Sequence, residues 1–84
     1  MNDVVLVTGV GPGTGKAIVE RFAASGYSVA MLARSAQRLN DIAQATPNTH
    51  PFVCDVSDAD RLSAVLEEIR QQLGAPKIVI HNAV

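Results

Sequence analysis

Hydrophobic residues along the chain follow two patterns that alternate from the N-terminus to the C-terminus. Short, largely apolar runs occupy residues 4–7, 28–33, 51–54 and 77–81, and the first is apolar on both faces, which is typical of a buried strand. The longer segments between these runs carry apolar residues at helical spacing. We therefore expect four strands, with helices at about 14–25, at 36–45 and between Ser57 and Gly74.

Capping and stop signals define the ends of the predicted helices. Ser35 and Ser57 are expected to cap the second and third helices, because a serine side chain accepts a hydrogen bond from the first helical turn. Gly26 and Gly74 are expected to end the first and third helices in a left-handed conformation. The residues expected to form the apolar faces of the three helices are Ala17, Ile18, Phe22 and Ala23; Leu39, Ile42 and Ala43; and Leu62, Val65, Leu66, Ile69 and Leu73.

The alternation of strands and helices predicts an α/β fold with a parallel sheet, because right-handed crossovers make successive strands parallel. The usual winding gives the strand order 3-2-1-4, with flanking helices, as an incomplete doubly wound sheet. Ligands bind such sheets beyond the carboxyl ends of the strands, at the point where the winding reverses. Residues 8–15, Arg34, Asp55 and Asn82 all follow strands at that end.

Length and composition describe one small domain over residues 1–84. The net charge of −1 offers no basic field for nucleic acid, and no apolar run approaches the ~18–20 residues that cross a bilayer. Cys54 is the only cysteine, and the N-terminus lacks the basic and apolar regions of a signal peptide, so we expect a cytoplasmic protein. Cys54 is expected to be a small buried hydrophobic residue.

A glycine-rich stretch, residues 8–15, joins the first strand to the first helix. Such a turn leaves the first N–H groups of the helix unpaired at the positive end of its dipole, which favours phosphate. A triphosphate-binding loop is excluded by Val10 and Ala17, which stand where it needs a glycine and a magnesium-binding hydroxyl. A dinucleotide loop fits better, because its glycines allow a tight turn and close approach to a pyrophosphate.

The motif Thr8-Gly9-x-x-x-Gly13-x-Gly15 resembles the cofactor motif of the short-chain dehydrogenase/reductase family. Asp55-Val56 after the third strand and Asn82-Ala83 after the fourth also resemble family features. The resemblance covers all 84 residues, which correspond to the first part of a usual member, and it implies a Rossmann-like fold. Two positions depart from the family pattern: Thr14 replaces the common Ile or Leu, and Val84 replaces the glycine of Asn-Ala-Gly.

Arg34 predicts the choice of cofactor. It ends the second strand 19 positions after Gly15, where a site for NAD places an Asp or Glu that accepts from the ribose 2′-hydroxyl. A guanidinium there favours the 2′-phosphate of NADP by about 1.5–3 kcal/mol. Ser35 is a second candidate donor to that phosphate, whereas Arg38 is expected to be a solvated charge.

The resemblance implies roles for the other residues of the site. It makes Asp55 the acceptor for the adenine amino group and Val56 an apolar wall, and it places Asn82 and Ala83 beside the cofactor. Thr8 is expected to tie two loops together through its hydroxyl. The glycine loop is expected to contact NADP(H) through Gly9, Gly11, Gly13, Thr14 and Gly15.

The residues for hydride transfer are missing from this sequence. In the resembled family a Tyr-x-x-x-Lys motif, with a preceding Ser, handles the substrate proton, but the only tyrosine, Tyr27, is followed four residues later by Met31. We therefore expect no catalytic residue, no substrate pocket and no activity of these 84 residues alone. The parent reaction implied by the resemblance is hydride exchange between NADPH and a carbonyl or alcohol, and family members usually dimerise through later helices, so oligomerisation is assigned to a full-length form.

Two alternatives to this enzyme fragment remain open. One is a non-catalytic module that holds a nucleotide, and the other is an inactive truncated product. His50 and His81 do not predict a metal site, because they lie on different strands and no cysteine or carboxylate accompanies them at ligand spacing.

Overall fold

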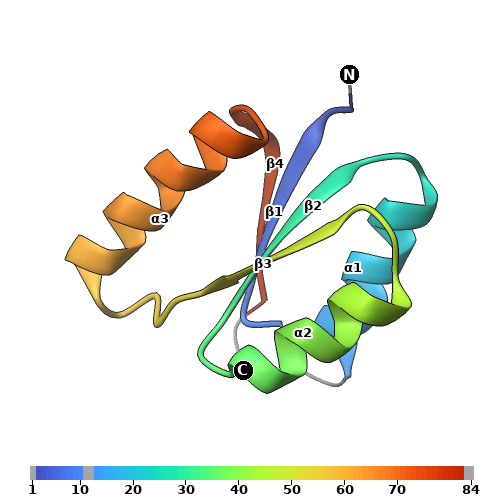
Figure 1. The fold of residues 1–84 in the computed structure, drawn as a ribbon, viewed down its shortest axis with the longest axis horizontal. Coiled ribbons are helices and arrows are strands. Elements are labelled where there is room, and N and C mark those ends of the chain that lie inside the picture. Colours follow the sequence, from blue (N-terminus) through green and yellow to red (C-terminus); the bar gives the residue numbers. More distant parts are fainter. Residues whose placement is uncertain (1, 11–12, 83–84) are drawn as a thin grey trace.

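Strands and helices alternate along the part of the chain that the computed structural model describes, residues 2–10 and 13–82. The helices lie on both faces of the sheet, with α3 on one side and α1 and α2 on the other (Figure 1). The elements of these residues are β1 (Val4–Thr8), α1 (Thr14–Ala24), β2 (Ser28–Ala33), α2 (Ala36–Ala45), β3 (Thr49–Val53), α3 (Ala59–Gln72) and β4 (Pro76–His81).

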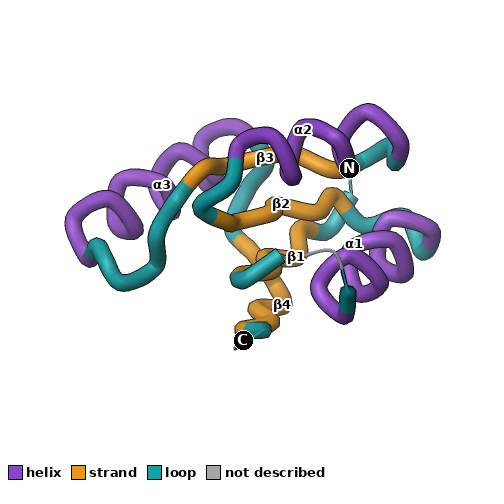
Figure 2. Tube along the Cα trace, turned by 90° about the horizontal axis from the view of Figure 1, so that it is seen from below, coloured by secondary structure: helices purple, strands orange, loops and turns teal. Residues whose placement is uncertain are grey.

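The strands form one parallel sheet in the order β3-β2-β1-β4, which confirms the predicted fold class and strand order. Figure 2 shows β1 and β2 in the middle of the sheet, with β3 and β4 at opposite edges. In the register of the sheet, Val5 of β1 lies between Val29 of β2 and Ile78 of β4. The carboxyl ends of β1 and β4 are therefore neighbours, with Thr8 paired to His81.

The core has two layers because β1 and β2 are buried on both faces. Alternate residues such as Val5 and Val7 pack against α1 and α2, whereas Leu6 packs against α3. The cluster under α1 and α2 contains Val5, Val7, Val10, Val19, Ala23, Val29, Met31, Leu39 and Ile42, and the cluster under α3 contains Val4, Leu6, Ala30, Leu32, Phe52, Cys54, Val65 and Ile69.

The predicted helix faces agree with the burial except at α1. Ala17, expected on the apolar face, is exposed, while Val19 is fully buried with Ala23. The prediction for Ala17 was wrong because alanine occurs on both the buried and the exposed faces of helices, so its hydrophobicity does not identify the buried face. In α2 and α3 the fully or nearly buried residues come from the predicted sets.

The third strand begins two residues earlier than its apolar run, 51–54, and ends one residue earlier. Pairing with β2 starts early because the backbone N–H of Val29 donates to the carbonyl of Asn48 at 2.8 Å. Thr49 is tolerated in the buried part of β3 because its hydroxyl donates to the carbonyl of Thr46 at 2.7 Å. Cys54 follows the strand and is buried, as expected.

Ser57 does not cap the third helix, so that prediction was wrong. The N-cap of α3 is Asp58, whose Oδ1 accepts from the backbone N–H of Arg61 at 3.1 Å. Ser57 instead donates its hydroxyl to Asp55. The cap of α2 is Ser35, as predicted, and its hydroxyl oxygen accepts from the N–H of Arg38 at 3.2 Å.

None of the helices in the described residues is long and apolar enough to cross a membrane. Within the same residues, no group of three or more His, Cys, Asp or Glu side chains is placed to hold a metal ion.

Candidate functional site

The turn after β1 begins at Gly9, whose backbone has a φ of +67°. A Cβ at this position would collide with the backbone carbonyl oxygen of Asn82. Both the left-handed conformation and the lack of space require glycine here. Gly11, the next glycine of the motif, lies outside the described residues.

Asn82 holds the loop, the sheet and α1 together. Its side-chain Nδ2 donates to the carbonyl of Gly9 at 3.1 Å, and its backbone N–H donates to the carbonyl of Thr8 at 3.2 Å. A Cβ on Gly15 would lie 3.1 Å from Asn82 Nδ2 and 3.0 Å from Val10 Cα, so α1 approaches the loop more closely than a side chain at this position normally permits. Ala83 lies outside the described residues.

The N-terminus of α1 differs from those of the other two helices in having no side-chain cap. Its N-cap is Gly13, which makes no side-chain hydrogen bond, and the first turn carries no acidic residue. Apart from its chain neighbours, no atom of the described residues lies within 4 Å of where a Cβ on Gly13 would stand, and the neighbouring Thr14 is exposed. The first N–H groups of α1 are therefore available to an anion that approaches closely.

Arg34 and Ser35 follow the carboxyl end of β2, which lies at the same end of the sheet as Gly9 and Asn82. The Arg34 side chain is exposed, and its positive charge helps to lower the pKa of Asp55, which follows β3. Ser35 is half-buried, and its hydroxyl oxygen is engaged as the cap of α2, which leaves its hydrogen free to donate.

The Asp55 carboxylate is fixed in a tight turn after β3. Its Oδ1 accepts the Ser57 hydroxyl at 2.7 Å and the Ser57 backbone N–H at 3.0 Å. These two hydrogen bonds, with the nearby charge of Arg34, lower the pKa of Asp55 from its ordinary 3.8, so the group is ionised at neutral pH and can only accept.

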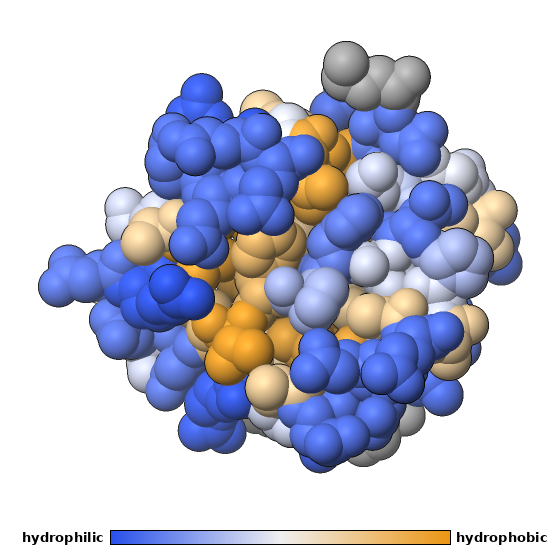
Figure 3. Space-filling view, in the orientation of Figure 1, coloured by the Kyte–Doolittle hydropathy of each residue, from blue (hydrophilic) through white to orange (hydrophobic). Residues whose placement is uncertain are grey.

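Two exposed hydrophobic residues lie close to Asp55 in the sequence. Val56 is 37% exposed and Val53, at the end of β3, is 43% exposed. Figure 3 shows hydrophobic surface between the hydrophilic helices on the face where β3 is in front. The end of β3 therefore combines a hydrogen-bond acceptor with exposed apolar residues.

The sequence did not predict the bond between Thr8 and His81. Thr8 Oγ1 and His81 Nδ1 are 2.6 Å apart, which joins the carboxyl ends of β1 and β4. Thr8 does tie two segments together, as expected, but its partner is His81, about which the sequence predicted only that it is not a metal ligand. A hydroxyl and a ring placed 73 residues apart leave no local signal that could identify the pair.

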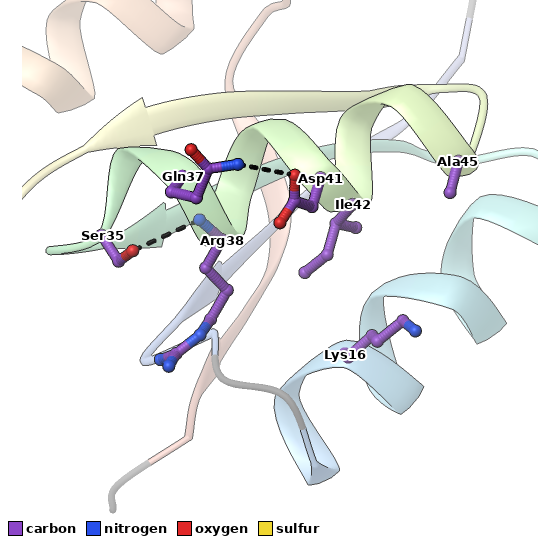
Figure 4. Close-up of a pocket in the computed structure, with 7 residues that line it drawn as sticks. All are labelled: Lys16, Ser35, Gln37, Arg38, Asp41, Ile42 and Ala45. Atoms are coloured by element: carbon purple, nitrogen blue, oxygen red, sulfur yellow. Dashed lines mark hydrogen bonds between the residues drawn. The ribbon is translucent and has the colours of Figure 1, made fainter.

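A pocket of about 410 Å³ lies between α1 and α2. Figure 4 shows Lys16 and Arg38 extending from the two helices toward the space between them, and Asp41 held by a hydrogen bond from Gln37. The hydrophobic pattern of the sequence does not indicate this pocket, because the pocket arises from the distance between the two helices. Its lining residues are Lys16, Ser35, Gln37, Arg38, Asp41, Ile42 and Ala45.

Two residues with reactive side chains lie away from the glycine loop. Burial raises the pKa of the Cys54 thiol, which keeps it protonated. Tyr27 stands at the amino end of β2 and packs edge-on against Phe22, with ring centroids 5.2 Å apart. It is at the opposite end of the sheet from Gly9 and Asn82, as expected.

Comparison with known proteins identifies relatives along nearly the whole chain. The family model described as short chain dehydrogenase matches residues 3–84. The chain is 33% identical to sulfoacetaldehyde reductase 2 of Chromohalobacter salexigens over 99% of this chain and 34% of that protein. It is 38% identical to a probable 2,4-dienoyl-CoA reductase of Caenorhabditis elegans, over 95% of this chain and 28% of that protein.

Comparison with solved structures indicates the same family. The fold matches a crystal structure of a short chain dehydrogenase from Bacillus anthracis with a TM-score of 0.91 and 29% sequence identity. That match covers 98% of this chain and 34% of the other. The chain therefore spans about a third of the length of the proteins it resembles.

Proposed function

Because this chain belongs to the short-chain dehydrogenase family, we propose that it is the NADP-binding part of an oxidoreductase that exchanges a hydride with a carbonyl or alcohol. NADPH supplies the hydride when it is bound. The residues that we propose to hold the cofactor are Gly9, Gly11, Gly13, Thr14, Gly15, Arg34, Ser35, Asp55, Val56, Asn82 and Ala83.

The observation that carries the proposal is the uncapped N-terminus of α1. Ser35 and Asp58 cap the other two helices, whereas Gly13 offers no side chain and leaves open space where its Cβ would stand. Backbone N–H groups and the positive helix end supply the donors that a pyrophosphate needs. Asn82 supports this arrangement by fixing the carbonyl of Gly9.

The choice of NADP rests on Arg34 and Ser35. An exposed guanidinium and a free hydroxyl hydrogen at the end of β2 suit a phosphate dianion, and the sequence has no acidic residue there to accept from a 2′-hydroxyl. Asp55, already ionised, would accept a hydrogen bond from the adenine amino group, while Val56 would cover one face of the ring.

The test is a comparison of NADPH and NADH binding by the purified chain and by Arg34→Asp. We expect the substitution to weaken NADPH relative to NADH by about tenfold or more, which is about 1.4 kcal/mol. Arg70→Asp is the matched control, because it makes the same charge change on exposed α3, away from the carboxyl ends of the strands. An unchanged preference in Arg34→Asp would show that Arg34 does not contact the cofactor.

We further propose that these 84 residues bind the cofactor without turning it over. Tyr27, the only tyrosine, packs on Phe22 at the wrong end of the sheet to exchange a proton with a substrate beside the nicotinamide. NADPH-dependent reduction of carbonyl compounds by the purified chain would refute this. Binding without turnover would also be the behaviour of a nucleotide-holding module, and a longer chain from the same reading frame that carries Tyr-x-x-x-Lys would favour the enzyme.

A further inference from the structure

The pocket between α1 and α2 gives Arg38 a setting that the sequence does not predict. The sequence pattern indicates only a solvated charge at this position. In the structure the exposed Arg38 lines the pocket together with Ser35, and its side chain extends from α2 toward the space between the two helices (Figure 4). Lys16, in the first turn of α1, lines the pocket from the other helix. Each of the two helices therefore places a positive charge at the pocket.

The order of residues along α2 gives the pocket two chemically different ends. Ser35 is the N-cap of the helix, and Arg38 lies in its first turn, which contains no acidic residue. Asp41 comes later, about 9 Å from Ser35 along the helix axis at the usual rise per residue. Its carboxylate is held by Gln37, whose Nε2 donates to Oδ1 at 2.9 Å. An anion is therefore favoured at the end of the pocket that Ser35 and Arg38 form.

A hydrogen bond connects the two residues at this end of the pocket. The Ser35 hydroxyl oxygen accepts from the backbone N–H of Arg38 at 3.2 Å, so the cap that begins the helix also fixes the backbone from which the guanidinium extends. The hydroxyl hydrogen of Ser35 remains able to donate. A guanidinium presents N–H donors in a planar fork that matches two oxygens of a phosphate. Ser35 and Arg38 together can therefore donate to three oxygens of one phosphate group.

We propose that Arg38 is a specificity-determining residue, whose guanidinium contacts the 2′-phosphate of NADP at the Ser35 end of this pocket. This inference rests on the proposed function, in which Ser35 already belongs to the cofactor site. Arg34 is not among the residues that line the pocket, so the two arginines meet the phosphate from different directions. Arg34 approaches it from the end of β2, and Arg38 approaches it from the first turn of α2.

The charges around the pocket explain why Arg38 would discriminate between the two cofactors. Arg34, Arg38 and Lys16 bring three positive charges to this part of the molecule. The 2′-phosphate of NADP is a dianion that these charges attract, whereas the ribose 2′-hydroxyl of NAD carries no charge and gains little from them. Specificity is a difference between two affinities, so a cation that helps one cofactor and not the other contributes directly to it.

The test compares adenosine 2′,5′-bisphosphate with adenosine 5′-monophosphate by calorimetric titration, because these probes differ only in the 2′-phosphate. Arg38→Gln should lower the preference for the bisphosphate about fivefold or more and change the affinity for the monophosphate by less than about twofold. Arg38→Lys keeps the charge without the fork and should retain part of the preference. Arg70→Gln makes the same change on exposed α3 and should have no effect. The fold should persist in Arg38→Gln, since glutamine keeps the N–H that Ser35 caps.

The outcomes separate this inference from the proposed function. A wild-type preference in Arg38→Gln, together with a lost preference in Arg34→Asp, would refute the role of Arg38 and leave the choice of NADP standing. Equal affinity of the wild-type chain for the two probes would refute the choice of NADP, and the inference with it.

The NMR signal of the Arg38 side-chain Nε–H gives a second measurement that needs no variant. It should shift when the wild-type chain binds adenosine 2′,5′-bisphosphate and stay nearly unchanged with adenosine 5′-monophosphate. Inorganic phosphate at the same concentration should cause a much smaller shift, because it lacks the adenosine that directs the 2′-phosphate to the pocket. An equal shift with inorganic phosphate would show a general anion site at Arg38 and overturn the assignment to the cofactor.

Discussion

At the scale of single residues, the glycines of the loop serve different physical needs. Gly9 is required by the protein itself, because a Cβ there would collide with the backbone of Asn82, and Gly15 is tightly packed against Val10, Gly9 and Asn82. A Cβ on Gly13 would meet no atom of the described residues beyond its chain neighbours, so the missing side chain matters to whatever approaches α1. The motif therefore contains positions that the fold itself restricts and one, Gly13, for which we propose a role in binding, and substitution can separate the two.

Gly13→Ala should leave the free energy of unfolding within about 1 kcal/mol of the wild type and weaken NADPH about tenfold or more. Gly9→Ala should instead lower the free energy of unfolding by about 2–4 kcal/mol, because it combines a left-handed backbone with a clash. Urea unfolding and fluorescence titration with NADPH measure the two effects. Equal NADPH affinity in Gly13→Ala and wild type would contradict the role given to the N-terminus of α1.

The hydrogen bonds from Ser57 to Asp55 should be visible in the pH dependence of the free energy of unfolding and in the pKa of Asp55. The folded pKa of Asp55 lies below 3.8, so this group contributes stability above the unfolded value of 3.8, and the contribution is lost as the pH falls through the folded pKa. Ser57→Ala removes the hydroxyl donor, which should raise the pKa of Asp55 toward 3.8 in an NMR titration of its carboxyl carbon. The control Arg34→Gln should raise it less, because the Arg34 charge comes last among the causes.

At the scale of elements, the cap of α3 illustrates how local sequence signals compete. Ser57 and Asp58 are adjacent, and both residue types favour N-caps. The backbone turn fixed by Asp55 engages the Ser57 hydroxyl, and the helix then begins one residue later with Asp58 as its cap. Whether Ser57 or Asp58 caps α3 depends on the turn before the helix, and the hydrophobic pattern of the sequence does not predict that turn.

Asp58→Ala should lower the free energy of unfolding by about 1 kcal/mol, because it leaves the N–H of Arg61 without its acceptor. Asp58→Ser should recover most of that loss, since serine also caps helices. Urea unfolding of the two variants and the wild type provides the comparison. A loss in Asp58→Ala no larger than in Asp58→Ser would show that the cap contributes little to the stability of α3.

The sequence predicted the order and type of every described element, because buried strands and amphipathic helices have different hydrophobic periods. It predicted the positions of Gly9, Arg34, Asp55 and Asn82 at one edge of the sheet for the same reason. It did not predict the hydrogen bond of His81, the early start of β3 or the pocket between α1 and α2. Those features depend on distances between elements that are remote in sequence.

At the scale of the whole molecule, a chain of this size has little stability to spare, so cofactor binding should be easy to detect. NADPH at a hundred times its dissociation constant should stabilise the fold by about 2.7 kcal/mol, which raises Tm by roughly 10–20 °C for a domain of this size. Thermal unfolding at one fixed protein concentration measures this increase in Tm, and the same concentration of NADH serves as the control. A Tm that NADPH leaves unchanged would argue against cofactor binding by this chain.

The contact between Asn82 and Gly9 has a consequence for the order of folding. The two residues are 73 positions apart, so the carbonyl of Gly9 gains its hydrogen-bond partner only after β4 has joined the sheet. Closing so long a segment is among the slower steps available to a small domain. On the ribosome, the first strand and its loop emerge long before Asn82, the residue that fixes the loop. The loop proposed to bind the nucleotide would therefore take its final form only after nearly all of these residues had been made.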